Sequence, residues 1–218
     1  MKAAASITFV SLALVALAAA RVSSAGDGRS ISKVNSSVTA AAGNTYDSIS
    51  TVNGDVHVER GVTAGSANTV NGSIRLEDDA RIGKASTVNG DIEAGTNVSI
   101  SDEATTVNGG LRFARNSKVG GEVSSVSGDI ELAGAEVTGL ITTVNGDIDL
   151  TDGAHARGGI HVRKPNRSGW NWNKDPVKVH VCSTCVVDGD LRFDRPVELR
   201  VDNGGRIGKV IGEDVTRR

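Results

Sequence analysis

The chain has 218 residues, a formal net charge of −2 and only 3% aromatic residues. A charge balance this close to zero does not provide the basic surface that nucleic acid or anionic lipid requires, so we expect neither as a partner. The scarcity of aromatic rings and the 27 glycines argue against a wide globular core and favour a narrow core of aliphatic side chains.

Residues 1–25 have the pattern of an export signal. Lys2 supplies a positive charge, residues 3–20 are almost wholly apolar, and small residues follow. This is typical of a secretory signal peptide. The apolar run is also long enough to stay as a membrane anchor, although alanine is only mildly apolar, so we favour cleavage. We therefore expect a flexible segment at 26–32 and an exported chain, in the periplasm or on the cell surface, without another membrane span.

A short phrase of the form Val-Asn-Gly-Asp-Ile recurs at a short and nearly constant interval. Such a period is typical of stacked repeats, in which each unit buries its apolar face against its neighbours. Aliphatic residues also recur every six positions, which predicts three short sides per coil. The copies begin at Val34 (degenerate), Val52, Val70, Val88, Val107, Val126 and Val144, and the phrase returns at Val187.

These periods predict an all-β fold, a three-sided parallel β-helix (solenoid) over residues 33–200, with a coil of about 18 residues made of three six-residue sides. The first Val of each phrase and the residue four positions later are the expected inward positions. Bulky residues at the second position, such as Ile74 and Leu111, favour a right-handed coil over a left-handed one. A chain of β-hairpins is the rival, because Asn-Gly is a strong hairpin signal. Hairpins would need a second shared turn signal in each repeat, and none is present.

Two polar columns accompany the phrase. Stacked Asn side chains can hydrogen-bond from coil to coil, and we expect such a ladder with Ser127 as its weak rung. Stacked carboxylates beside the Gly corner form a weak calcium-site candidate, for which a solvated face is the simpler interpretation, so we expect no metal and no cofactor. The ladder residues are Asn53, Asn71, Asn89, Asn108 and Asn145, and the acidic column is Asp55, Asp91, Asp129 and Asp147.

The repeat is interrupted at residues 163–176, where two prolines and two tryptophans predict a loop excursion. Trp170 and Trp172 could bind a carbohydrate or a protein partner, since aromatic side chains supply much of the contact energy at such sites; alternatively they cover part of the stack. Residues 201–218 are rich in charge and are expected to form a C-terminal cap or tail.

Cys182 and Cys185 form the one compact motif with chemical potential. In an exported chain two cysteines most often form a disulfide. A redox pair would need a helix N-terminus, which the sequence does not predict, and a zinc site would depend on His161 and His180 as further ligands. The remaining histidines, His57 and His155, lie beside no nucleophile, so we expect no enzymatic activity.

The repeated Thr-Val-Asn-Gly-Asp-Ile phrase behind a signal peptide resembles the adhesin-domain family of bacterial envelope proteins, over residues 33–200. The coil period is also similar to that of bactofilins, which are polymer-forming β-helices that lack a cleaved signal. The resemblance implies a structural or binding protein of the envelope, whose partner would be another envelope protein or a carbohydrate. Self-association into a bactofilin-like scaffold is the alternative, and a calcium-binding solenoid or a β-helix enzyme acting on carbohydrate are remoter ones.

Overall fold

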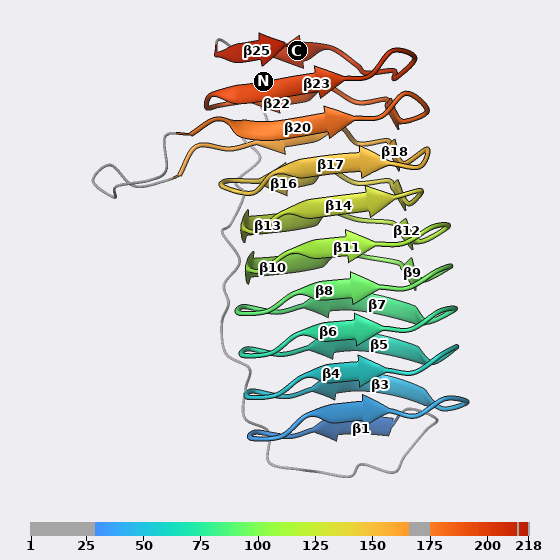
Figure 1. Cartoon of the computed structure of the whole chain (residues 1–218). Helices are drawn as coiled ribbons and strands as arrows, with labels where there is room; N and C mark the ends of the chain where they lie inside the picture. Colours follow the sequence, from blue (N-terminus) through green and yellow to red (C-terminus); the bar gives the residue numbers. More distant parts are fainter. Residues whose placement is uncertain (1–28, 166–174, 213, 218) are drawn as a thin grey trace, which may run out of the picture.

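The computed structural model of the protein describes residues 29–165, 175–212 and 214–217. In this part of the chain all secondary structure is β, and the strands wind into a stack of flat coils (Figure 1). Strands in neighbouring coils pair in parallel and in register, as in His57 with Arg75 and Glu93 with Arg112. The predicted parallel β-solenoid with roughly 18 residues per coil is therefore confirmed.

Side one of the coil is a sheet of ten short strands, so the rod is about 43 Å long at about 4.8 Å per coil. Its strands, in spatial order, are β2 (Val38–Ala40), β4 (Val56–Val58), β6 (Ile74–Leu76), β8 (Ile92–Ala94), β11 (Leu111–Phe113), β14 (Ile130–Ala133), β17 (Ile148–Thr151), β20 (Val177–Val181), β23 (Val197–Val201) and β25 (Val215–Arg217).

Sides two and three belong to one bent sheet. In the first coils a single strand covers both sides: β1 (Arg29–Ser32, the shortest), β3 (Thr45–Ser50), β5 (Thr63–Asn68) and β7 (Arg81–Ser86). Later coils divide it. Side two then consists of β9 (Ser99–Ile100), β12 (Lys118–Val119), β15 (Glu136–Val137), β18 (His155–Ala156) and β21 (Val186–Val187). Side three consists of β10 (Ala104–Asn108), β13 (Val123–Ser127), β16 (Ile141–Thr143), β19 (Ile160–Val162), β22 (Leu191–Phe193) and β24 (Val210–Ile211).

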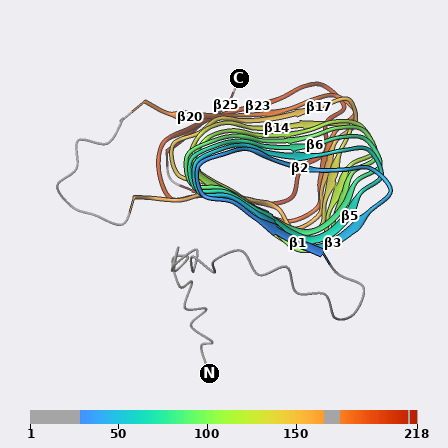
Figure 2. The same cartoon turned by 90° about the horizontal axis from the view of Figure 1, so that it is seen from below.

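The coil is right-handed. In Figure 1 the strands of side one run from left to right at the front while the chain climbs, and the strands of the bent sheet return behind them. Figure 2, seen from below, places side one opposite β1, β3 and β5 and shows the closed outline of the coil. The chain thus turns clockwise as it recedes from the viewer, which is the expected right-handed sense.

Each side directs two side chains inward, so that the core is a stack of six-residue layers. Most of these positions are buried and aliphatic, with Tyr46, Phe113, Ser117 and Cys185 among the exceptions, and the last is a Thr or Ser in the coils from Thr51 to Thr143. In one coil the inward residues are Val56 and Val58 on side one, Val62 and Ala64 on side two, and Ala67 and Thr69 on side three. The three pairs are what makes the coil three-sided.

One inward column differs from the sequence prediction. The first Val of the phrase is not inward: Val52 and Val70 are half-buried, whereas Thr51 and Thr69 before them are 1% and 3% exposed. The chain turns its corner across the Val-Asn-Gly-Asp segment, so the last inward residue precedes that segment. Burial of the hydroxyl is possible because it donates to a carbonyl one coil earlier, as Thr69 Oγ1 does to Gly54 O at 2.9 Å.

The Gly of each Asn-Gly corner is required by close stacking. A Cβ on Gly90 would lie 2.1 Å from Gly72 O, and one on Gly109 would lie 2.0 Å from Gly90 O. A left-handed backbone is instead found at a different corner, between sides one and two, where Asp79 has φ 63° and Asn97 has φ 62°. Asp and Asn tolerate this region better than other residues with a side chain.

Both ends of the solenoid extend beyond the predicted limits. Residues 29–32, expected to be flexible, form β1, which pairs in parallel with β3. Residues 201–218 are not a tail throughout, because β24 and β25 lie in this segment and add to both sheets. In each case, backbone groups of one more coil are satisfied by pairing with the coil below or above. The excursion lies between β19 and β20, and its residues 166–174 are outside the described part.

Replacing Gly109 by Ala should lower the free energy of unfolding by at least about 2 kcal/mol, since overpacking of this kind costs about 1–3 kcal/mol or more. The neighbouring Gly110→Ala is the matched control, because its Cβ would lie 3.2 Å from the nearest atom, Asp129 O. Urea unfolding of both variants measures the difference. Equal losses would contradict the stacking explanation.

Candidate functional site

The Asn-Gly corner between sides three and one carries the ladder of amide side chains. Each Asn donates from Nδ2 to Oδ1 of the Asn one coil earlier: Asn71 to Asn53 at 2.7 Å, and Asn89 to Asn71 at 2.8 Å. The ladder begins one rung lower than expected, where Asn53 donates to Asn35 at 2.8 Å, and it reaches Asn108, which donates to Asn89 at 2.9 Å.

Asn145 is not brought into this ladder. Ser127 occupies the intervening coil, and Asn145 Oδ1 instead accepts from Arg195 Nη1 at 2.7 Å. Arg195 is 4% exposed and also donates to the backbone carbonyls of Val144, at 2.5 Å, and Asp175, at 2.8 Å. Burial lowers the pKa of Arg195 against the opposing charge of Asp175. Arg195 therefore links the coil after the excursion to the corner below it through hydrogen bonds. The repeat pattern gives no signal for this contact.

The acidic column beside this corner hydrogen-bonds to the backbone. Asp55 Oδ1 accepts from the Ser73 amide at 2.8 Å, and Asp91 Oδ1 accepts from the Gly110 amide at 2.7 Å. Asp129 accepts from the Asp147 amide at 2.9 Å, and Asp147 in turn accepts from the Lys178 amide at 2.8 Å. These carboxylates therefore accept hydrogen bonds from backbone N–H groups of the next coil.

Serine and glycine separate most of the carboxylates in this column, which limits the repulsion between like charges on neighbouring strands. Ser73 stands between Asp55 and Asp91, and Gly110 stands between Asp91 and Asp129. Within the described residues, no group of three or more His, Cys, Asp or Glu side chains is placed to hold a metal ion.

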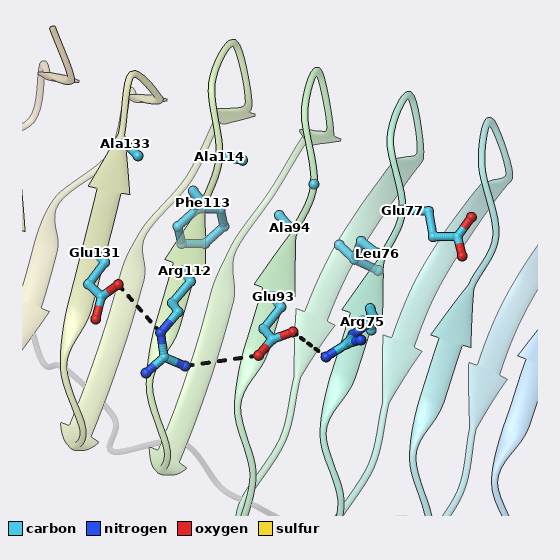
Figure 3. Close-up of a pocket in the computed structure, with 11 residues that line it drawn as sticks. Arg75, Leu76, Glu77, Glu93, Ala94, Arg112, Phe113, Ala114, Glu131 and Ala133 are labelled. Carbon is cyan, nitrogen blue, oxygen red and sulfur yellow. Dashed lines mark hydrogen bonds and ion pairs between the residues drawn. The ribbon is translucent and has the colours of Figure 1, made fainter. Parts of the chain in front are cut away.

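The outward face of side one carries a ladder of alternating charge that the sequence analysis did not identify. Arg75 contacts Glu93 at 2.6 Å, and Arg112 contacts Glu131 at 3.4 Å and Glu93 at 4.0 Å (Figure 3). The negative charge of Glu131, aided by Asp91 and Glu93, raises the pKa of Arg112 despite partial burial. The spacing of these charged residues by one coil is the sequence feature that could have revealed the ladder.

An open depression of about 510 Å³ lies beside this ladder. Its floor is formed where small residues replace the larger ones of other coils, at Ala94, Gly95, Ala114 and Ala133, beside the ring of Phe113 (Figure 3). The neighbouring carboxylates are already paired, Glu93 and Glu131 with arginines and Glu77 with His57. The depression therefore presents a concave apolar surface. The charged side chains around it already form ion pairs between coils.

Cys182 and Cys185 form a disulfide across the corner between β20 and β21. The corresponding corners of other coils contain a residue in the left-handed region, for example Gly61 with φ 68° and Asp79 with φ 63°. Neither Ser183 nor Thr184 has a positive φ. Cys185 is fully buried and takes the inward position that Val62 has in its coil. The disulfide thus closes a corner that lacks the usual turn residue.

All four histidines contact carboxylates of neighbouring coils. His57 Nε2 lies 2.8 Å from Glu77. His155 lies 2.6 Å from Asp188, and His161 lies 2.8 Å from Asp194. His180 bridges two carboxylates, Asp149 at 2.7 Å and Asp202 at 3.1 Å. His161 and His180 do not converge with the disulfide into a metal centre.

Three of these bridges join the coil before the excursion to coils after it, one on each side of the rod. On side one, burial lowers the pKa of His180, but the hydrogen bonds to Asp202 and Asp149 outweigh burial and raise it overall. The hydrogen bond from His180 lowers the pKa of Asp202. On side three, burial raises the pKa of Asp194, but the hydrogen bonds from His161 and Arg192 outweigh it and lower the pKa.

Trp170 and Trp172 lie outside the described residues. The described ends of the excursion, residues 163–165 and 175–176, leave and rejoin the coil at the Asn-Gly corner, next to Asn145 and Arg195. In the described part of the chain no helix has the length and hydropathy needed to cross a bilayer.

The fold and its surface define a class: a right-handed parallel β-solenoid with short coils, whose charged side chains are paired mainly between coils. Comparison of the chain with protein-family models, with curated proteins and with solved structures gave no match.

We expect the free energy of unfolding to decrease as the pH rises above about 6.5, the ordinary pKa of histidine. A raised folded-state pKa at His180 stabilises the protein fully below that pH, and the contribution disappears as the pH passes through the raised value. The lowered pKa values of Asp194 and Asp202 stabilise above about pH 4 and lose effect as the pH falls further.

Urea unfolding between pH 4 and pH 8 measures this dependence in the wild type, in His180→Gln and in His57→Gln. The His180 variant should lose most of the decrease above pH 6.5. The matched control, His57→Gln, removes an imidazole that contacts one carboxylate rather than two. A pH profile of His180→Gln that is parallel to the wild type would contradict the assignment.

Proposed function

We propose that the chain is a non-enzymatic, exported β-solenoid that acts as an adhesin-like or structural binding protein of the cell envelope. The observation that carries this proposal is that the titratable side chains pair with one another between coils. Imidazoles, guanidinium groups and carboxylates lie in stacked columns and pair between coils, as in His57–Glu77 and Arg75–Glu93. A surface built in this way is suited to holding flat faces rigid and presenting them to a partner.

Two features support export to the periplasm or cell surface. The apolar segment within residues 1–25 has the pattern of a cleaved signal peptide. Cys182 and Cys185 lie at disulfide distance, and disulfides persist in oxidising compartments. The proposed partner is an envelope protein or a carbohydrate; nucleic acid is disfavoured by the acidic column on side one.

A second candidate is end-to-end association into a scaffold. The outer edges of β1 and β2 at one end, and of β24 and β25 at the other, have no partner strand within the described residues. Unpaired edges of this kind can template the pairing of another chain. The large apolar side chains that are exposed in the described part lie near these two ends, Val34 at 43% and Ile211 at 40%.

Export can be tested by expressing the full chain in a bacterium with a periplasm. We expect a periplasmic protein that begins near residue 26 and has Cys182 and Cys185 oxidised, as measured by fractionation and intact mass before and after reduction. Deleting residues 2–25 should leave a cytosolic chain with free thiols. A full-length chain that begins at Met1 and stays in the cytosol would remove the proposal.

The contribution of the excursion at residues 163–176 to partner binding is a separate prediction. Replacing Trp170 and Trp172 by Ala should leave the melting temperature unchanged and weaken retention of the purified chain on isolated envelopes by at least about tenfold, if each ring supplies about 1 kcal/mol of contact energy. Replacing Lys164 by Ala, at the base of the same excursion, is the control. Unchanged retention of the double variant would exclude the tryptophans as the binding element.

A further inference from the structure

An uncharged stripe runs along the solenoid where side three meets the Asn-Gly corner. It consists of three outward columns over six successive coils, and none of its positions carries a charge. The columns are Ser50, Asn68, Ser86, Thr105, Ser124 and Thr142; Val52, Val70, Val88, Val107, Val126 and Val144; and Asn53, Asn71, Asn89, Asn108, Ser127 and Asn145. We call this surface the neutral stripe.

The first column of the neutral stripe, from Ser50 to Thr142, carries hydroxyl groups at every position except Asn68, whose Nδ2 donates to Ser66 Oγ. The side chains of Ser50, Ser86, Thr105 and Ser124 form no hydrogen bond with the described part of the chain, although each hydroxyl can both donate and accept. The column ends at Thr142, which faces outward because Ile141 and Thr143 face inward. Its Oγ1 is buried, the residue is 4% exposed, and no hydrogen-bond partner for it is described.

The other two columns provide apolar and amide groups at the same spacing. The valines from Val52 to Val126 are half-buried, so they expose part of their methyl surface. The Asn ladder uses one N–H and one lone pair of each amide between coils, which leaves the second N–H and second lone pair facing outward. Hydroxyl, methyl and amide groups therefore repeat together about every 4.8 Å.

The dimensions of the neutral stripe fit a thin chain better than a folded protein. In the sixth coil Thr142 and Val144 are buried and Asn145 accepts from Arg195, so the exposed part of the stripe spans five coils. Its four steps give a length of about 19 Å, and three residues across give a width of about 10 Å. The resulting area of about 190 Å² is well below the roughly 800 Å² that each partner buries in a stable protein complex.

The carboxylates on the side-one flank of the stripe select against polyanions. Asp55, Asp91 and Asp129 border the stripe on side one, and the Lys84–Glu103 ion pair borders it on the other flank. A polyanion would be repelled by the carboxylates, whereas the hydroxyl, methyl and amide groups of the stripe itself match an uncharged chain. We propose that the neutral stripe binds an uncharged polysaccharide laid along the solenoid axis, an inference that rests on the proposed binding function and names its partner class.

The test is affinity electrophoresis of the purified chain, residues 26–218, through gels containing neutral polysaccharides: hydroxyethyl cellulose, arabinoxylan, galactomannan and dextran. Carboxymethyl cellulose, which has the cellulose backbone with added carboxylates, is the anionic comparison. We expect retardation by at least one neutral polymer and little by the anionic one. Failure of all four neutral polymers to retard the chain, or equal retardation by carboxymethyl cellulose, would overturn the proposal.

A charge pair placed on the stripe identifies the surface. Ser86→Lys with Thr105→Glu puts opposite charges on two paired positions of adjacent coils, and we expect at least tenfold weaker binding. Thr45→Lys with Thr63→Glu is the matched control on side two, also at paired positions, and should bind like the wild type. Ser50→Lys with Asn68→Glu repeats the test lower on the stripe, should the first variant not fold.

Wild-type binding that both stripe variants retain would overturn the assignment of the surface. This result would leave export and the tryptophan prediction untouched. Conversely, a chain that is not exported would remove the proposed envelope function without changing the behaviour of the purified protein in the gels.

Discussion

In-register stacking of equivalent residues at about 4.8 Å is the constraint on which the whole structure depends. Every residue of a regular coil lies above its counterpart from the coil before, so each column must contain residues that tolerate their own kind as neighbours. Glycine recurs at the Asn-Gly corner because the carbonyl of the Gly below leaves no room for a Cβ. Asn recurs next to it because an amide can donate and accept along the same axis.

The same constraint controls the electrostatics of the surface. A column of one charge would place like charges on adjacent strands, which is destabilising. The chain avoids most such neighbours by alternation, as in the series Arg75, Glu93, Arg112 and Glu131, or by capping with backbone N–H groups, as in the acidic column. A consequence is that titratable groups are largely engaged in holding the coils together, and the neutral stripe is where polar groups remain free for a partner.

The sequence predicted the fold well because the coil length of a stacked architecture appears directly as the repeat period of the sequence. The repeat period and the six-residue length of each side predicted the parallel three-sided coil. Bulky inward residues such as Ile74 predicted its right-handed sense. Sequence reasoning placed Val52 inward instead of Thr51, because hydropathy alone does not reveal that a buried hydroxyl can donate to the coil below. Asn145 and its partner Arg195 lie on opposite sides of the excursion in the sequence, a contact for which the repeat pattern gives no signal.

The most direct test of the central claim is the pattern of backbone nuclear Overhauser effects in the isotope-labelled chain, residues 26–218. In-register parallel stacking predicts amide-to-Hα contacts that link Ile74 to Ile92 and Ile92 to Leu111, with the same one-coil step repeated along the rod. Contacts between positions whose residue numbers have a constant sum would indicate antiparallel hairpins. That result would contradict the stacked solenoid and everything inferred from its columns.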